Sequence, residues 1–80
     1  MHKIYPEYHT VDITLAAVLK ETGYSLDRIT INNRKGTFIF LNVESEFIEN
    51  FDKGNLLVEP VSFYNAVRTL TTAIKRQVNG

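Results

Sequence analysis

Few side chains in this sequence belong to the types that enzymes use for nucleophilic or acid–base chemistry. There is no cysteine, and no serine stands in the Gly-x-Ser-x-Gly setting that marks an activated nucleophile. His9 could act as a base only if a hydroxyl group folded beside it. The glycines are too widely spaced along the chain to form a phosphate-binding loop. We therefore expect no enzymatic activity and no catalytic residues.

Metal ligands are also scarce. His2 and His9 are the only imidazoles, and without cysteine they are too few for a structural zinc site. Five carboxylates between residues 44 and 59 stand against a single base, Lys53, and two of them, Glu46 and Glu49, lie three residues apart. Such a pair could share a cation, but a run of acids is ordinarily a solvated helix face. The sequence therefore predicts no metal site and no cofactor.

Basic and aromatic residues form the most informative chemical pattern. Residues 60–80 hold three cations and no acid, and two further cations mark the tip of an expected hairpin. Two phenylalanines follow that tip on one strand face, where aromatic rings beside basic groups can stack the bases of a single strand. The candidate nucleic-acid-binding residues are Arg34, Lys35, Arg68, Lys75 and Arg76, with Phe38 and Phe40 as candidates for base stacking or for an interface. The alternative is that both rings lie in the core under a helix.

Length, charge and hydropathy restrict the class of protein. The 80 residues allow one domain, and nine basic against nine acidic residues give a net charge of zero. This balance argues against bulk electrostatic capture of duplex nucleic acid but leaves room for a local patch. No apolar run approaches the roughly 20 residues of a membrane span, and the first residues lack a signal peptide's apolar core. We expect a cytoplasmic protein without a membrane partner.

Hydrophobic periodicity and turn residues predict an α+β fold. Residues 1–9 are expected to form an N-terminal arm, and residues 10–80 a single domain. Alternating residues on both sides of a turn at Asn33–Gly36 predict a hairpin over 28–43. We expect helices over about 10–22, 44–53 and 60–77, and a short strand at 56–58. The predicted order is α-β-β-α-β-α, with a small antiparallel sheet packed against three helices.

The second strand of the hairpin is apolar on both faces. Phe38 and Phe40 alternate with Ile39 and Leu41, so both faces need covering. The helices of so short a chain readily cover one face, whereas the other needs a helix, a ligand or a second subunit. Small domains without disulfides often compensate by oligomerising. We therefore expect a homodimer.

Several segments together resemble a known family. They are Asp12–Leu19 followed by Gly23-Tyr24, then Gly36–Phe40, Phe51–Gly54 and Val58–Leu70. They are similar to a family of small domains found in bacteriophages and other bacterial mobile elements and known only as a domain of unknown function. The resemblance implies a mobile-element origin and the cytoplasm of the host cell, and it implies no activity.

Two functional hypotheses follow. The first is a non-enzymatic binding module that holds nucleic acid through the basic last helix and the hairpin tip. The alternative is a protein–protein interaction module, or an inhibitor of a host protein, that acts as a homodimer and engages a host or phage protein.

Overall fold

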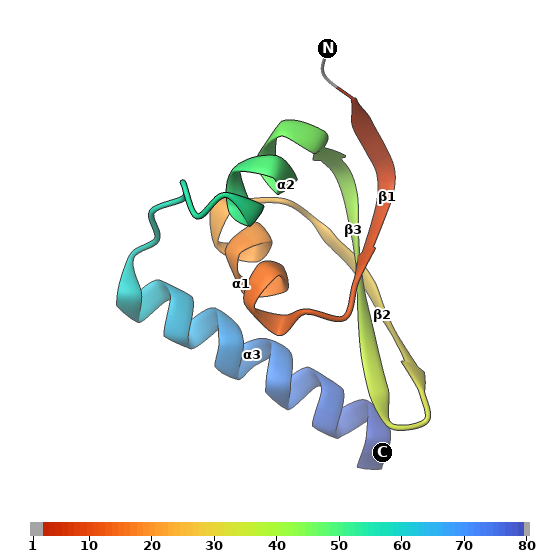
Figure 1. Cartoon of the computed structure of the whole chain (residues 1–80). Helices are drawn as coiled ribbons and strands as arrows, with labels where there is room; N and C mark the ends of the chain where they lie inside the picture. The colour runs from red at the N-terminus through yellow and green to blue at the C-terminus, as the bar shows by residue number, and fades with distance from the viewer. Residues whose placement is uncertain (1–2, 80) are drawn as a thin grey trace.

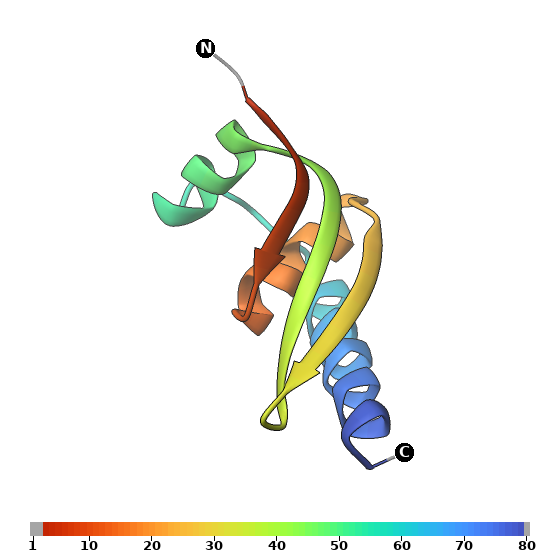
Figure 2. The ribbon, with the colours of Figure 1, turned by 90° about the vertical axis from the view of Figure 1, so that its right-hand side faces the viewer.

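The computed structural model describes residues 3–79, without the side chain of Asn79. Three strands and three helices follow in the order β1-α1-β2-β3-α2-α3. Their bounds are β1 Ile4–Thr10, α1 Ile13–Thr22, β2 Leu26–Asn32, β3 Lys35–Glu44, α2 Ser45–Asp52 and α3 Pro60–Asn79. The sheet is antiparallel with the strand order β1-β3-β2. All three helices lie on one side of it, so the fold has two layers (Figures 1 and 2). The predicted α+β class, the antiparallel sheet and the three helices are confirmed.

Helix α1 is the central helix of the fold. Asp12 caps its first turn by accepting hydrogen bonds from the backbone N–H groups of Thr14 and Leu15 at 2.8 and 3.3 Å. Gly23 ends it with a φ of 114°, in the left-handed region that glycine adopts without strain. The whole run Leu15–Leu19 between these caps is buried. Burial on all sides explains why this helix has no polar face.

The first strand of the sheet comes from the segment that the sequence predicted as an arm. Within residues 1–9, Met1 and His2 lie outside the described residues, while Ile4–Thr10 forms β1 and pairs with β3. Pro6 lies inside this strand, at the edge of the sheet, where a residue without an N–H costs no ladder hydrogen bond. The third strand therefore precedes α1 and does not follow α2.

Residues 56–58, the predicted short strand, belong instead to the irregular connection between α2 and α3. Leu57 is 100% exposed there. The physical reason is pairing: a strand exists only by hydrogen bonding to a neighbour, and the described sheet contains no strand from this segment.

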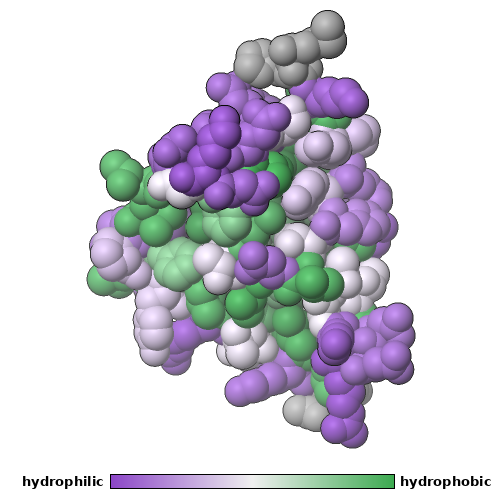
Figure 3. Space-filling view, in the orientation of Figure 1, coloured by the Kyte–Doolittle hydropathy of each residue, from purple (hydrophilic) through white to green (hydrophobic). Residues whose placement is uncertain are grey.

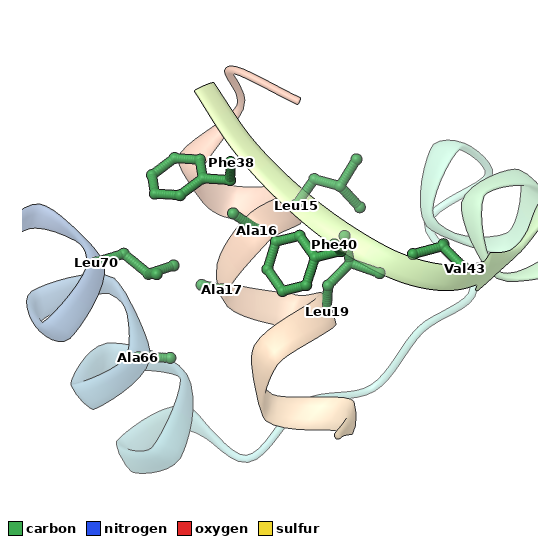
Figure 4. Packing of buried hydrophobic residues seen from close by; sticks show 9 residues of the cluster. All are labelled: Leu15, Ala16, Ala17, Leu19, Phe38, Phe40, Val43, Ala66 and Leu70. Atoms are coloured by element: carbon green, nitrogen blue, oxygen red, sulfur yellow. The ribbon is translucent and has the colours of Figure 1, made fainter. Parts of the chain in front are cut away.

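The core lies between the sheet, α1 and α3. Phe38 and Phe40 of β3 are 1% and 0% exposed, and their rings point toward α1 and α3 (Figure 4). Small residues of α1, Ala16 and Ala17, leave room for these rings and for Leu70 of α3. The sequence left open whether the phenylalanines are core residues or stacking platforms, and the structure places them in the core.

Within residues 3–79, no helix lies on the other face of the sheet (Figure 2). Ile39 is nevertheless only 1% exposed. Its cross-strand neighbours are His9 of β1 and Arg28 of β2, and cross-strand neighbours share a face. The Arg28 guanidinium donates to both carboxylate oxygens of Glu7 at 3.3 Å, so this ion pair joins the two outer strands across β3.

We call Glu7, His9, Asp27 and Arg28 the charged lid. Long side chains cover apolar surface with their stems while their charged ends stay in water, and the lid covers Ile39 in this way. The expected homodimer depended on an uncovered second face of β3. On that face one chain buries Ile39 by itself, while Leu41 stays partly exposed. The burial of Ile39 removes part of the reason for a dimer at this strand.

Candidate nucleic-acid interface

The tip of the β2–β3 hairpin presents two of the predicted cations. Asn33 and Arg34 form a two-residue turn with φ values of 52° and 66°. Positive φ at both central residues is the mark of a type I′ turn, which usually has glycine at the second position. Arginine is strained at such a φ because its Cβ crowds the backbone. Arg34 and Lys35 are both exposed at this end of the sheet.

A close contact brings the hairpin tip to the last turns of α3. A Cβ atom placed on Gly36 would lie 2.8 Å from Cδ1 of Ile74, closer than real Cβ contacts allow. Glycine thus lets β3 and α3 approach until the backbone meets the Ile74 side chain. Lys35 and Lys75 are the chain neighbours of these two residues. The tip and the end of α3 lie at the same end of the molecule in both ribbon views (Figures 1 and 2).

The outer face of α3 carries polar and basic side chains over three turns. A shallow hollow runs along it, lined by Asn65, Arg68, Thr69, Thr72, Ala73 and Arg76. The opposite face packs into the core through Ala66 and Leu70. We call Arg34, Lys35, Arg68, Lys75 and Arg76 the basic end. The structure brings four of these residues to one extremity, and Arg68 lies two turns earlier on the same helix.

In the described part of the chain, no acid neutralises the basic end. Neither the tip, residues 33–36, nor α3 contains an Asp or Glu. Within residues 3–79 the cations of the basic end make no ion pair with the carboxylates of the described chain. Arg68 instead lies over the Tyr64 ring, 5.8 Å from its centroid. These cations are therefore available to an external anion.

A group of four acids lies at the other end of the molecule. Glu44, Glu46, Glu49 and Asp52 lie at the end of β3 and along α2. Hydrophilic side chains cover the α2 end and the hairpin end of the surface (Figure 3). Four of the nine acids thus lie at the end of the molecule opposite the basic end.

Hydrogen bonds fix the start of α3. The backbone N–H of Ser62 donates to a carboxylate oxygen of Glu59 at 2.6 Å. This bond, together with those from the Ser62 hydroxyl and the Val61 backbone, holds the pKa of Glu59 below its usual 4.5. The backbone N–H of Glu59 in turn donates to Glu21 of α1 at 3.1 Å. The direction of α3 is therefore set by a tie to the last turn of α1.

The burial of Phe38 and Phe40 changes the chemistry that the site can offer. Fully buried rings present no face to a base, so the predicted stacking role has no support in this fold. What remains is a surface of cations, amides and hydroxyls. Among residues 3–79, no three His, Asp or Glu side chains converge in a way that could hold a metal ion. No helix in that range is long and apolar enough to cross a membrane.

Sequence reasoning missed two features. Asn65, Thr69 and Thr72 share the outer face of α3 with the arginines, and their spacing of three and four residues would have placed them there. An exposed apolar group also went unnoticed, which we call the apolar patch: Leu57, Val58, Val61 and Tyr64. Hydrophobic side chains gather over this part of the surface (Figure 3). The patch exists because residues 56–58 form no strand, which leaves Leu57 and Val58 exposed.

By fold, the protein is a small α+β domain with a three-stranded sheet, helices on one side and a basic end. It belongs to the family described as a domain of unknown function, DUF5659, whose model matches residues 6–77. The match begins inside β1 and ends near the end of α3. It therefore confirms the predicted resemblance to a domain of unknown function. Neither a curated protein nor a solved structure shows significant similarity to the chain.

Proposed function

We propose that the protein is a non-enzymatic module that binds nucleic acid through its basic end. The supporting observation is a group of five cations, without an acid among them, on the hairpin tip and α3, with four of the five at one extremity. Phosphate binding is the main source of affinity in such modules, and it needs cations whose charge is not already neutralised. The proposal includes the mobile-element origin and the cytoplasmic location that the family resemblance implied.

The test compares two double variants with the same net charge. Lys75→Gln/Arg76→Gln removes two cations from the basic end, whereas Lys20→Gln/Lys53→Gln removes two exposed cations elsewhere. Binding of short labelled DNA is followed by fluorescence anisotropy over a salt series. At about 0.1 M salt, each lost phosphate contact weakens binding by about an order of magnitude. The first variant loses two cations, and we expect its DNA binding to weaken by this factor for each of them. We expect little change in DNA binding for the second variant.

Equal losses in the two variants would mean that net charge alone governs binding, and the basic end would not be the site. No salt-dependent binding of any DNA or RNA at micromolar protein would overturn the proposed function.

The apolar patch favours a second function, contact with a further copy of this chain. Leu57 is 100% exposed, and Val61 and Tyr64 are 64% and 61% exposed. Exposed apolar clusters mark sites of protein association, and a chain of 80 residues gains stability from a partner. The expected homodimer is therefore proposed at the apolar patch and not at β3. The alternative partner for this patch is a host or phage protein.

Light scattering after size-exclusion chromatography tests this second function. We expect a dimer for the native chain and a monomer for Leu57→Asp/Val61→Asp, because charges in the patch would have to be desolvated. Thr69→Asp, on the same helix but outside the patch, is the control. A native chain that stays monomeric at high concentration would remove the homodimer.

A further inference from the structure

The structure offers little to a single strand. Proteins that bind single strands without sequence preference stack bases on exposed aromatic rings. Phe38 and Phe40 are buried, and the exposed ring nearest to the basic end, Tyr64, already lies beside the Arg68 guanidinium. A surface of cations, amides and hydroxyls suits a duplex, whose bases stay stacked and present only their edges.

The outer face of α3 has the dimensions of a helix that enters a groove. Its 20 residues span about 30 Å, and the B-form major groove is about 12 Å wide, enough for one α-helix. The lower left border of Figure 1 is formed by α3, with no other element outside it. Thr69, Thr72 and Ala73 along the centre of the hollow are small, so the helix axis can come close to a groove floor.

The side chains on this face are of the types that read base edges. Arginine pairs with guanine O6 and N7, asparagine pairs with adenine, and threonine contacts the thymine methyl group or a phosphate. Asn65, Arg68 and Arg76 line the hollow together with the threonines. No carboxylate on α3 would repel a phosphate. The A-form major groove of duplex RNA is too narrow for side chains to read, so these features favour DNA.

The hairpin tip adds contacts beside the helix. Because Gly36 faces Ile74, the hairpin tip lies beside the last turns of α3, with Arg34 exposed in the turn and Lys35 on the opposite face of β3. A helix lying in the major groove has the two phosphate backbones on its flanks. The tip is therefore placed to hold one backbone while the helix lies between them.

We propose that α3 enters the major groove of B-form DNA, with Asn65, Arg68 and Arg76 toward the base edges and Arg34 and Lys35 on the flanking phosphates. This inference rests on the proposed function and narrows it to one partner and one groove. Arg68 and Asn65 set the sequence preference, and the hairpin tip supplies affinity that is independent of sequence.

The first experiment asks for the partner and the groove. The full chain is titrated with one mixed sequence as duplex DNA, as single-stranded DNA and as duplex RNA. The DNA complex is then challenged with methyl green, which occupies the major groove, and with netropsin, which occupies the minor groove. We expect the tightest binding to duplex DNA and displacement by methyl green only. With phosphate contacts from Arg34, Lys35 and Lys75, the slope of log K against log salt is about −2.7.

The second experiment separates the helix from the tip. Arg34→Gln/Lys35→Gln should weaken binding equally for all sequences and reduce the salt slope by about 1.8. Asn65→Ala/Arg68→Ala should flatten the sequence preference obtained by selection from a random duplex pool. All four side chains are on exposed positions, so circular dichroism should show unchanged folds.

Each other outcome has a definite meaning. Tighter binding to single strands or to duplex RNA, or displacement by netropsin but not by methyl green, would overturn the major-groove inference and leave the proposed function standing. Unchanged selection by Asn65→Ala/Arg68→Ala would also overturn it, since α3 would then read no bases. Absence of salt-dependent binding to all three probes would remove both.

Discussion

Arg34 occupies a backbone conformation that glycine would adopt more easily. Its φ of 66° lies in the left-handed region, which costs a residue with a Cβ roughly 1–2 kcal/mol in regular structure. Backbone strain of this kind gathers at functional positions, where the surrounding structure maintains it. At the tip, the strained conformation belongs to a residue that is exposed at the end of the sheet. At this position the stability of the fold favours glycine, whereas the proposed DNA binding favours arginine.

The variant Arg34→Gly should separate the effect of this residue on stability from its effect on DNA binding. We expect the free energy of unfolding to rise by up to about 1 kcal/mol in urea denaturation, because glycine relieves the strain of the turn. DNA binding should weaken at the same time. Lys35→Gly is the matched control: it removes the same charge from a strand position without a positive φ, so it should lower both stability and binding. A loss of stability in Arg34→Gly would show that the backbone conformation of Arg34 is not strained.

Gly36 connects the hairpin to α3, and its replacement should disturb both. In Gly36→Val the new Cβ meets Ile74, and overpacking of this kind costs about 1–3 kcal/mol. This loss would run against the usual preference of strands for valine over glycine. Thermal unfolding measures it. Ile74→Ala should restore part of the lost stability in the double variant, and a simple sum of the two losses would show that the residues do not interact.

At the scale of elements, the charged lid makes the sheet sensitive to acid. Hydrogen bonds from Arg28, and then from His9, hold the pKa of Glu7 below its ordinary value of 4.5. Below pH 4.5 the unfolded chain therefore takes up this proton before the folded chain does. The stabilisation by the Glu7 carboxylate is complete above pH 4.5 and is lost as the pH falls through the folded pKa.

Glu7→Gln tests this dependence. The difference in unfolding free energy between the native chain and the variant should be largest above pH 4.5 and should close on acidification. Urea denaturation over a pH series measures it. Glu49→Gln makes the same charge change on the exposed face of α2 and should show no comparable trend. A gap that stays constant to low pH would mean that the Glu7 ion pair does not stabilise the fold.

The elements with local signals could be predicted from the sequence. The helices over about 10–22 and 60–77 and the hairpin over 28–43 rest on signals within a few residues of each other, and each appears close to where it was expected. The strand β1 could not be predicted, because its partner β3 is more than 25 residues away and Pro6 argues against a strand. The opposite error at 56–58 arose because β-branched and leucine residues favour a strand only where a partner is available.

The candidate site shows the same division. All five cations were candidates by their residue types, but the contact that brings the hairpin tip to α3, Gly36 with Ile74, joins segments 38 residues apart. No local pattern signals such a contact. The alternating pattern of β3 also could not show which of its faces lies in the core. Ile39 lies on the face opposite Phe38 and Phe40 and is equally buried. Long side chains from the flanking strands cover Ile39, and periodicity contains no information about them.

At the scale of the whole molecule, the separation of charge predicts an effect on the rate of association. The α2 acids repel an approaching polyanion over about a Debye length, roughly 10 Å at 0.1 M salt. Glu49→Gln/Asp52→Gln should therefore speed association with DNA at low salt, as measured by stopped flow, with little effect on dissociation. The difference should vanish at high salt. An affinity gain that persists at high salt would mean that α2 itself touches the DNA.

Both edge strands of the sheet have a feature that opposes fibril growth. Pro6 removes a donor from the outer strand β1, and the pairing of β2 is irregular between Leu26 and Arg28. A strand from another molecule needs a flat, unbroken row of partners to add itself in register. We therefore expect concentrated solutions of the chain to stay free of amyloid-like aggregates, although two of its three strands border open solvent.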